Sequence, residues 1–301
     1  MSAVSIMDCI GHTPCLELNM QGGTVFAKAE FLNPGGSIKD RIIRHILDNA
    51  EQEGRLTHGT HIAEASSGNT GIALAMAGAA MGYKVTIFMP ETASLERQKM
   101  IRHLGAEVVL TPAGESVGGA VDALHRLIAE EGDIFTVGQF VNKENIQAHY
   151  RTTARELWED VSCNVDCFIS GIGSGGTLMG VGLYLKEKQP NIHIAAVEPK
   201  GASALLGQAN SLHRIEGIGD GFIPEILQPS IISNIIEIQD DVAMKYAADL
   251  AKSHGILAGI SSGANLAAAA QIAKEHPEWR IATILPDRAE RYFSTGLFGA
   301  I

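Results

Sequence analysis

The sequence predicts an α/β protein with two lobes, each built on a mostly parallel, twisted sheet flanked by helices. Segments with strand and helix patterns alternate along nearly the whole chain, which is typical of parallel sheets covered by helices. Glycine-rich turns precede several helices, as in sheets that bind ligands at the carboxyl ends of their strands. A length of 301 residues suits two domains of ordinary size.

In the first half, strands are expected where apolar residues alternate or cluster between turn residues. These are residues 24–30, 61–65, 84–89, 107–110 and 133–137. Helices are expected where apolar residues recur every three or four positions. These are residues 37–53, 71–81, 94–104 and 117–131.

The second half repeats this alternation. Strands are expected at 165–170, 193–198, 231–238 and 281–285, and helices at 149–161, 178–188, 241–254 and 261–275. Residues 201–229 lack a periodic pattern, and loops of that length are often functional. The boundary between the lobes is expected near 138–145, with a small lobe of residues 35–145 and a large lobe of residues 1–34 and 146–301.

Composition excludes several classes of function. Hydrophobic residues make up 46% of the chain and charged residues 19%, as in a soluble globular protein. The net charge of −11 argues against nucleic acid or an anionic membrane as a partner. The four cysteines (Cys9, Cys15, Cys163 and Cys167) form no zinc-type spacing. No secretion signal and no apolar run of membrane-spanning length is found. We therefore expect a cytoplasmic protein with reduced thiols and no bound metal.

The segment 33–41 (Asn-Pro-Gly-Gly-Ser-Ile-Lys-Asp-Arg) opens the first predicted helix. Ser37 is a favourable N-cap, and Lys39 falls in the first turn. The helix dipole is positive at that end, so an ammonium group is disfavoured there. One interpretation is an exposed lysine that tolerates the position, with Asp40 offsetting its charge. The other is an amine that is kept neutral and forms a Schiff base with a carbonyl.

The turn 171–177 (Gly-Ile-Gly-Ser-Gly-Gly-Thr) lies between a predicted strand and a predicted helix. Glycines let backbone amides approach an anion, and the helix N-terminus favours negative charge. The turn therefore favours phosphate binding over a tight turn needed for packing alone. It also matches the dinucleotide pattern GxGxxG, although only Glu198 stands near the expected position of the acidic ribose ligand.

Two further turns of small polar residues precede helices. Residues 66–70 (Ser-Ser-Gly-Asn-Thr) suit a carboxylate, and residues 261–263 (Ser-Ser-Gly) form a third turn. Each is also explained as an ordinary helix cap. His12, His149 and His213 are each interpreted as turn or surface residues rather than metal ligands. The charged segment from Asp287 to Tyr292 is interpreted as a solvated or ion-paired loop.

Together these motifs resemble the cysteine synthases (O-acetylserine sulfhydrylases), pyridoxal-phosphate enzymes of fold type II related to cystathionine β-synthase. The resemblance spans essentially the whole chain. It rests on motifs in the family's order: 10–14 (Ile-Gly-His-Thr-Pro), 33–41, 67–71 (Ser-Gly-Asn-Thr-Gly), 173–177, 216–219 (Glu-Gly-Ile-Gly), 259–263 (Gly-Ile-Ser-Ser-Gly) and 290–292 (Glu-Arg-Tyr).

The resemblance implies pyridoxal phosphate at the interface of the lobes. Lys39 matches the Schiff-base lysine, which also moves the proton of the substrate α-carbon. Asn69 matches the residue bonded to the phenolic oxygen of the cofactor, and Ser261 the serine facing its pyridine nitrogen. The cofactor-phosphate loop is matched by Gly173, Ser174, Gly175, Gly176 and Thr177. The substrate carboxylate site is matched by Ser66, Ser67, Asn69, Thr70 and Gln139.

The resemblance also implies that the small lobe closes on the substrate while the large lobe binds the cofactor, and that the protein is a homodimer. Serine acetyltransferase docks on some members of the family. The segment after Gly201 is short and weakly basic around His213 and Arg214, so docking of that enzyme is not expected.

Some positions depart from the family pattern. Ser66 stands where threonine is usual, Ala93 where many members have methionine, Asp220 where alanine is usual, and Asp287 where serine is common. A carboxylate at Asp220 could repel sulfide, bind an amine or activate water, or it could be a surface loop residue.

The predicted function is therefore β-replacement on O-acetylserine, or a similar activated serine, with sulfide to give L-cysteine. The alternatives within the family are a cystathionine β-synthase-like activity and a conversion of cysteine to serine and hydrogen sulfide that uses Asp220. The alternatives outside this reaction class are a nicotinamide-dinucleotide-binding protein and a catalytically weak family member kept as a partner protein.

Overall fold

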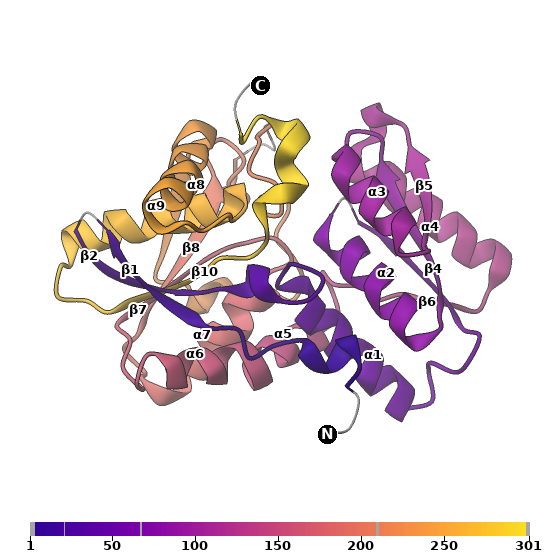
Figure 1. Ribbon diagram of the computed structural model, residues 1–301, viewed down its shortest axis with the longest axis horizontal. Coiled ribbons are helices and arrows are strands. Elements are labelled where there is room, and N and C mark those ends of the chain that lie inside the picture. The colour runs from indigo at the N-terminus through magenta and orange to yellow at the C-terminus, as the bar shows by residue number, and fades with distance from the viewer. Residues whose placement is uncertain (1–3, 21, 67, 209–210, 299–301) are drawn as a thin grey trace.

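The computed structural model describes residues 4–20, 22–66, 68–208 and 211–298. Within these residues the chain forms two separate sheets, of six and four strands (Figure 1). We call the four-stranded sheet with α2 (Asn69–Met81), α3 (Leu95–His103) and α4 (Ser116–Glu131) the small lobe. The six-stranded sheet with α5 (Glu144–Ala148), α6 (Ala154–Asp160), α7 (Gly176–Lys188), α8 (Asp240–His254) and α9 (Ile260–Glu275) is the large lobe.

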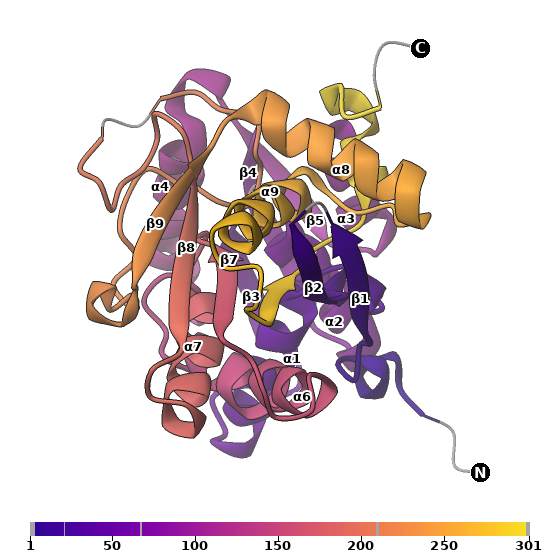
Figure 2. The same cartoon turned by 90° about the vertical axis from the view of Figure 1, so that its left-hand side faces the viewer.

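The large sheet has the order β1-β2-β10-β7-β8-β9, and its strands face the viewer in Figure 2. All neighbouring strands are parallel except β1 and β2. The strands are β1 (Cys15–Met20), β2 (Gly23–Lys28), β7 (Cys167–Gly171), β8 (His193–Pro199), β9 (Asn234–Ile238) and β10 (Ile281–Ile284).

The small sheet has the order β5-β4-β3-β6 and is parallel throughout the described residues. Its strands are β3 (His61–Ala65), β4 (Lys84–Pro90), β5 (Glu107–Thr111) and β6 (Ile134–Phe135). Helix α1 (Lys39–Gln52) lies between the lobes, because it packs against α2 on one side and α5 on the other. The first residue of α1 is Lys39.

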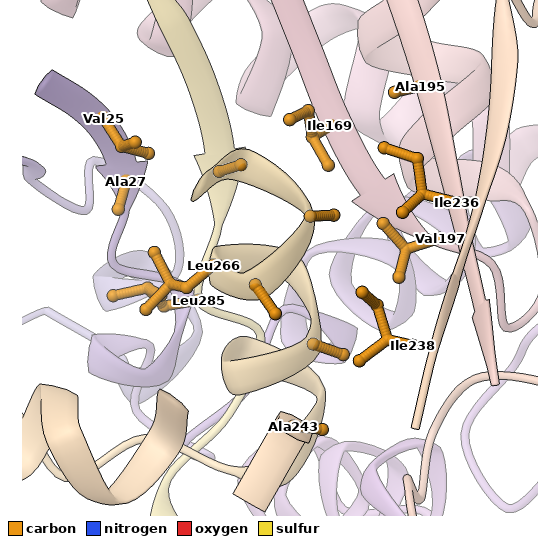
Figure 3. Packing of buried hydrophobic residues seen from close by; sticks show 14 of the residues in the cluster. Val25, Ala27, Ile169, Ala195, Val197, Ile236, Ile238, Ala243, Leu266 and Leu285 are labelled. Carbon is orange, nitrogen blue, oxygen red and sulfur yellow. The ribbon is translucent and has the colours of Figure 1, made fainter. Parts of the chain in front are cut away.

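Helix α9 is rich in alanine and is buried along most of its length. It packs against the large sheet in a cluster that includes Val25 and Ala27 of β2, Ile169 of β7 and Val197 of β8 (Figure 3). Helices α6 and α7 cover the opposite face of the sheet. This packing fixes the starts of α7 and α9, where two of the predicted cofactor turns lie.

The predicted fold class, with two mostly parallel sheets flanked by helices, is confirmed. Strand 61–65 matches β3 residue for residue, but β1 was not predicted, and the strand expected at 231–238 starts only at Asn234. The helix expected at 149–161 begins at Glu144 and contains one turn of π-helix, His149–Thr153. Helix α1 starts at Lys39 after Ile38 in helical conformation, one residue later than a cap at Ser37 implies, yet Ser37 Oγ still accepts a hydrogen bond from the Lys39 amide at 3.3 Å. No helix among the described residues is long and apolar enough to cross a membrane.

Candidate active site

Lys39 is positioned by backbone pairing between two distant segments. The Ile38 amide donates to the Pro286 carbonyl at 2.9 Å, and the Arg288 amide donates to the Gly36 carbonyl at 3.2 Å. Ser37 and Asp287 face one another in this short antiparallel bridge. The start of α1 is therefore joined to the segment that follows β10 of the large sheet.

The amine of Lys39 has a lowered pKa. Burial among protein atoms disfavours the ammonium form, while the carboxylates of Asp220 and Asp287 oppose the shift. The residue as a whole is only partly buried, but its amine is surrounded by enough protein to lose much of its hydration. The interpretation of Lys39 as an amine that loses its proton easily is thus supported over that of an ordinary exposed lysine.

The glycine-rich loop lies at the start of α7. Gly175 has a φ of +83°, which favours glycine, and the helix begins at Gly176. A Cβ at Gly176 would overlap Asn145 Oδ1, and a Cβ at Gly173 would overlap the Gly217 carbonyl oxygen. The loop therefore needs glycines for close packing and also presents a helix N-terminus, which suits an anion.

Asn145 is a site residue that the sequence did not indicate. Its side chain is fully buried, and its Nδ2 donates to Ser174 Oγ at 2.9 Å and to the Gln139 carbonyl at 2.8 Å. It thereby links the glycine-rich loop to the segment that connects the lobes. No local pattern singles out this asparagine, because its side-chain partner Ser174 is distant in the sequence.

His149 is buried beneath the same loop, so its interpretation as a turn or surface residue was wrong. Its Nε2 lies 3.3 Å from Thr177 Oγ1, and its Nδ1 lies 2.9 Å from Thr153 Oγ1. Burial lowers the pKa of the imidazole well below its usual value, with the charges of Arg41, Lys39 and His45 adding to the shift. A neutral ring therefore supports Thr177.

The turn at the start of α2 contains the predicted carboxylate site. Ser66 Oγ accepts hydrogen bonds from the amides of Gly68 and Gly71, at 3.2 and 3.3 Å. Thr70 Oγ1 donates to Gln139 Oε1 at 2.8 Å, and both side chains are buried. Ser67 lies outside the described residues. The structure thus brings Thr70 and Gln139 together, whereas Ser66 acts as a cap of this turn.

Asn69 is held by the segment after β10. Its Nδ2 donates to Asp287 Oδ2 at 2.7 Å, and its Oδ1 accepts a hydrogen bond from Arg291. Tyr292 donates to the same Asp287 oxygen at 2.7 Å. Asp287 has 0% of its surface exposed and Arg291 has 2%. Of the two interpretations of this segment, solvated or ion-paired, the solvated one is wrong for Asp287 and Arg291, which are buried in a hydrogen-bonded network at the site.

Asp220 faces the glycine-rich loop. Its Oδ2 lies 3.9 Å from the place that a Cβ on Gly173 would take. The carboxyl is accessible to solvent, yet the surrounding protein desolvates it enough to raise its pKa, against the charges of Lys39 and His213. His213 in turn contacts the Gly219 carbonyl through Nε2 at 2.9 Å. Asp220 therefore lies near enough to Lys39 for the charge of each to act on the pKa of the other.

Ser261 lies in the first turn of α9 and is buried. The preceding Gly259 donates its amide to the Asp287 carbonyl at 2.9 Å. One turn later, Asn265 accepts from the Gly171 amide at 2.8 Å and donates to the Ile284 carbonyl at 2.9 Å. The start of α9 is thus joined to Asp287 and to the strand end that leads into the glycine-rich loop.

These residues fit a cofactor that carries an aldehyde and a phosphate. The amine of Lys39 has a lowered pKa, as a Schiff-base lysine requires. The glycine-rich loop leads into the N-terminus of α7, and the first amides of a helix favour an anion because they lack partners within the helix. Asp287 Oδ1 is buried without a hydrogen-bond partner among the described residues, which marks a polar position open to a further group.

The known proteins that this chain resembles agree with this interpretation of the site. A curated relative named cysteine synthase B, from Campylobacter jejuni, is 46% identical over 97% of this chain and 98% of its own. A crystal structure of a cysteine synthase from Entamoeba histolytica has a TM-score of 0.94 and 41% identity, covering 99% of this chain and 91% of that one. A hydrogen sulfide-producing enzyme from Fusobacterium nucleatum has a TM-score of 0.93 and 39% identity, covering 97% of this chain and 100% of that one.

A family model described as pyridoxal-phosphate dependent enzyme matches residues 6–287, which is nearly the whole chain. The glycine-rich loop, the lysine with a lowered pKa and both sheets fall within the matched part. The chain therefore belongs to the family of pyridoxal-phosphate-dependent enzymes.

Proposed function

We propose that this protein is a cysteine synthase that joins O-acetylserine and sulfide. The bond between the β-carbon and the acetyl oxygen breaks, acetate leaves, and a bond from sulfur to the β-carbon forms. The names of the relatives, cysteine synthase in Campylobacter jejuni and Entamoeba histolytica, support this reaction. The observation that carries it is the amine of Lys39, whose pKa is lowered at the place where the two lobes meet.

Pyridoxal phosphate supplies an electron sink for chemistry at the α-carbon when it is bound. We assign its phosphate to the glycine-rich loop, its phenolic oxygen to Asn69 and its pyridine nitrogen to Ser261. The loop residues are Gly173, Ser174, Gly175, Gly176 and Thr177. Because the family uses pyridoxal phosphate, the GxGxxG pattern is assigned to this phosphate and not to a nicotinamide dinucleotide.

Lys39 provides the base of the reaction. Its Nζ, when neutral, accepts the proton of the substrate α-carbon and returns it after sulfur has added to the β-carbon. Burial favours the neutral amine, while the carboxylates of Asp220 and Asp287 favour the protonated amine. The two opposing influences keep the amine able to take up and release a proton in turn.

The substrate carboxylate is assigned to the turn at the start of α2. Thr70 and Gln139 are joined by a 2.8 Å hydrogen bond, and we assign Ser66, Ser67 and Asn69 to the same carboxylate site. Helix N-termini favour anions because their first amides lack partners within the helix. We propose that residues 35–145 close over this carboxylate and exclude water.

We further propose that the enzyme works as a cytoplasmic homodimer and does not bind serine acetyltransferase. The family resemblance supports the dimer, and the weakly basic segment around His213 and Arg214 argues against the complex.

The experiment is a product panel on the purified protein reconstituted with pyridoxal phosphate. O-acetylserine with sulfide, O-acetylserine with homocysteine, and cysteine alone are compared in the wild type, Lys39→Ala and Lys99→Ala. Lys99 is an exposed residue of α3 and serves as the control. With O-acetylserine and sulfide, the wild type and Lys99→Ala should make cysteine as the main product. Lys39→Ala should make none. A main product other than cysteine would overturn the proposal.

A second activity is favoured by Asp220. Its carboxyl faces the glycine-rich loop next to Lys39, and a relative of known structure is named a hydrogen sulfide-producing enzyme. A carboxylate there could activate water, which would convert cysteine to serine and hydrogen sulfide, or bind the amine of homocysteine. The Asp220→Asn variant tests this, because the ratio of serine and cystathionine to cysteine should fall. An unchanged ratio would remove Asp220 from the chemistry.

A further inference from the structure

Arg97 is a buried cation that belongs to none of the assigned sites. It lies in α3 of the small lobe, and 2% of its surface is exposed. A buried guanidinium is costly unless its charge and its N–H groups find partners. The partners of Arg97 therefore show what the residue stabilises.

Two of these partners belong to the large lobe. The Nη1 of Arg97 forms an ion pair with Glu216, and its guanidinium lies over the Tyr292 ring, 4.9 Å from the centroid. Glu216 is partly exposed and stands four residues before Asp220 in the same loop. Tyr292 donates to Asp287, which in turn holds Asn69.

The third neighbour of Arg97 is the turn at the start of α2. A Cβ on Gly68 would lie 3.3 Å from Arg97 Nε, so the guanidinium packs directly against the backbone of this turn. One side chain of the small lobe thus contacts three segments: the proposed carboxylate turn, the loop of Asp220 and the segment of Asp287.

We propose that Arg97 is a positioning residue, which holds the carboxylate turn of the small lobe against the Asp220 loop of the large lobe through Glu216 and Tyr292. This inference rests on the proposed function, because it concerns how that site binds its amino acid. Arg97 itself does not touch the reacting atoms. It sets the affinity for the amino-acid carboxylate by stabilising the arrangement in which both loops face the substrate.

Binding of L-alanine to the cofactor-loaded protein tests this role. L-alanine has the amine and carboxylate of the substrate but no leaving group, so its binding is read from the change in cofactor absorbance without turnover. In Arg97→Gln the dissociation constant should rise at least about tenfold, and KM for O-acetylserine should rise more than kcat falls. Arg97→Lys should recover part of the affinity, because it restores the charge.

The pairing with Glu216 is tested by a double-mutant cycle. Glu216→Gln should weaken L-alanine binding, and the double variant Arg97→Gln/Glu216→Gln should bind no more weakly than the worse single variant. Glu96→Gln is the matched control, because Glu96 accepts an exposed hydrogen bond from Ser294 at 2.7 Å across the same boundary. The Glu96→Gln variant should bind L-alanine as tightly as the wild type does.

Hydrogen–deuterium exchange separates this inference from the proposed function, since it needs no turnover. In Arg97→Gln, amides of residues 68–75 and 213–220 should exchange faster, while those of α8 should not change.

Unchanged L-alanine binding and unchanged exchange in Arg97→Gln would overturn the role of Arg97, even if the wild type makes cysteine. If the wild type makes no cysteine, faster exchange in Arg97→Gln would still support the link between the lobes. If Arg97→Gln does not fold, L-alanine binding and amide exchange are compared with the wild type in Glu216→Gln and Arg97→Lys instead.

Discussion

Asn69 donates a 2.7 Å hydrogen bond to Asp287, which joins the first residue of α2 in the small lobe to the segment after β10 in the large lobe. The same carboxylate oxygen accepts the hydroxyl of Tyr292. Asp287 also raises the pKa of Lys39 by its charge. One buried carboxylate therefore supports the structure of the site and influences the protonation of its amine, and the two effects can be separated by substitution.

The structural effect should appear in Asp287→Ala. This variant leaves the Tyr292 hydroxyl and the Asn69 amide without their acceptor, so the free energy of unfolding should fall by about 2 kcal/mol or more. Chemical denaturation of the cofactor-free protein measures this free energy. The Asp287→Asn variant keeps an acceptor oxygen, so its free energy of unfolding should fall by less. Equal stability of the alanine and asparagine variants would contradict this account.

The electrostatic effect should appear in the pH dependence of cofactor uptake. The carboxylates of Asp220 and Asp287 stabilise the ammonium form of Lys39 and so raise its pKa, and removing either charge should lower that pKa further. The rate at which cofactor-free protein takes up pyridoxal phosphate follows the neutral amine. When this rate is measured as a function of pH, the midpoint of the profile should therefore move to lower pH in Asp287→Asn and in Asp220→Asn.

The control for this shift is Asp241→Asn, because Asp241 is an exposed residue in the first turn of α8. Its uptake profile should coincide with that of the wild type. A midpoint that moved to higher pH in Asp287→Asn would show that the sign assigned to this interaction is wrong.

Close packing of the glycine-rich loop should make Gly176 irreplaceable. An alanine Cβ there would overlap Asn145 Oδ1, and relief of such overpacking costs about 1–3 kcal/mol. Gly176→Ala should therefore bind pyridoxal phosphate at least about tenfold more weakly, as measured by equilibrium titration. Gly118→Ala is the matched control, because a Cβ on Gly118 in α4 meets nothing within 4 Å. Similar affinity in the two variants would refute the packing argument.

Asp40 should make the stability of the protein pH-dependent. Burial raises the pKa of its carboxyl to about 7, although the Gly35 amide donates to it at 2.6 Å. A carboxyl whose pKa is raised on folding stabilises the protein fully below its unfolded pKa of about 4. That contribution is lost as the pH rises toward 7.

Asp40→Asn removes this titration. Its free energy of unfolding, relative to the wild type, should therefore increase between pH 4 and pH 7, by up to roughly 4 kcal/mol. The exposed Asp48 on the same helix provides the control Asp48→Asn. A difference from the wild type that does not change across this pH range would contradict the raised pKa.

Local sequence patterns predicted much of the fold. The apolar segments of β3 and β4 lie between clear turn residues, and both strands were found within one residue of their bounds. Strand β1 was missed although Leu16, Leu18 and Met20 alternate before a glycine turn, so a signal for it existed. The π-helical turn at His149, which packs against α7, has no such signal in the sequence.

The candidate site residues that the sequence indicated lie in or next to glycine-rich turns, as Lys39 and the loop at Gly173 do. The roles of Asn145, Asp287 and Arg97 could not be predicted in this way. Each has at least one partner tens of residues away, such as Ser174 for Asn145 and Asn69 for Asp287. Only the folded chain brings these partners together, and burial gives the contacts their strength.

The central claim is that Lys39 binds the cofactor covalently. Reduction of the cofactor-loaded protein with borohydride, followed by mass mapping of its peptides, tests this most directly. The account predicts a pyridoxyl group on the peptide that contains Lys39, with no labelling of Lys28, which is buried in ion pairs with Glu156 and Asp160. Labelling of another lysine, or no reducible cofactor at all, would contradict it.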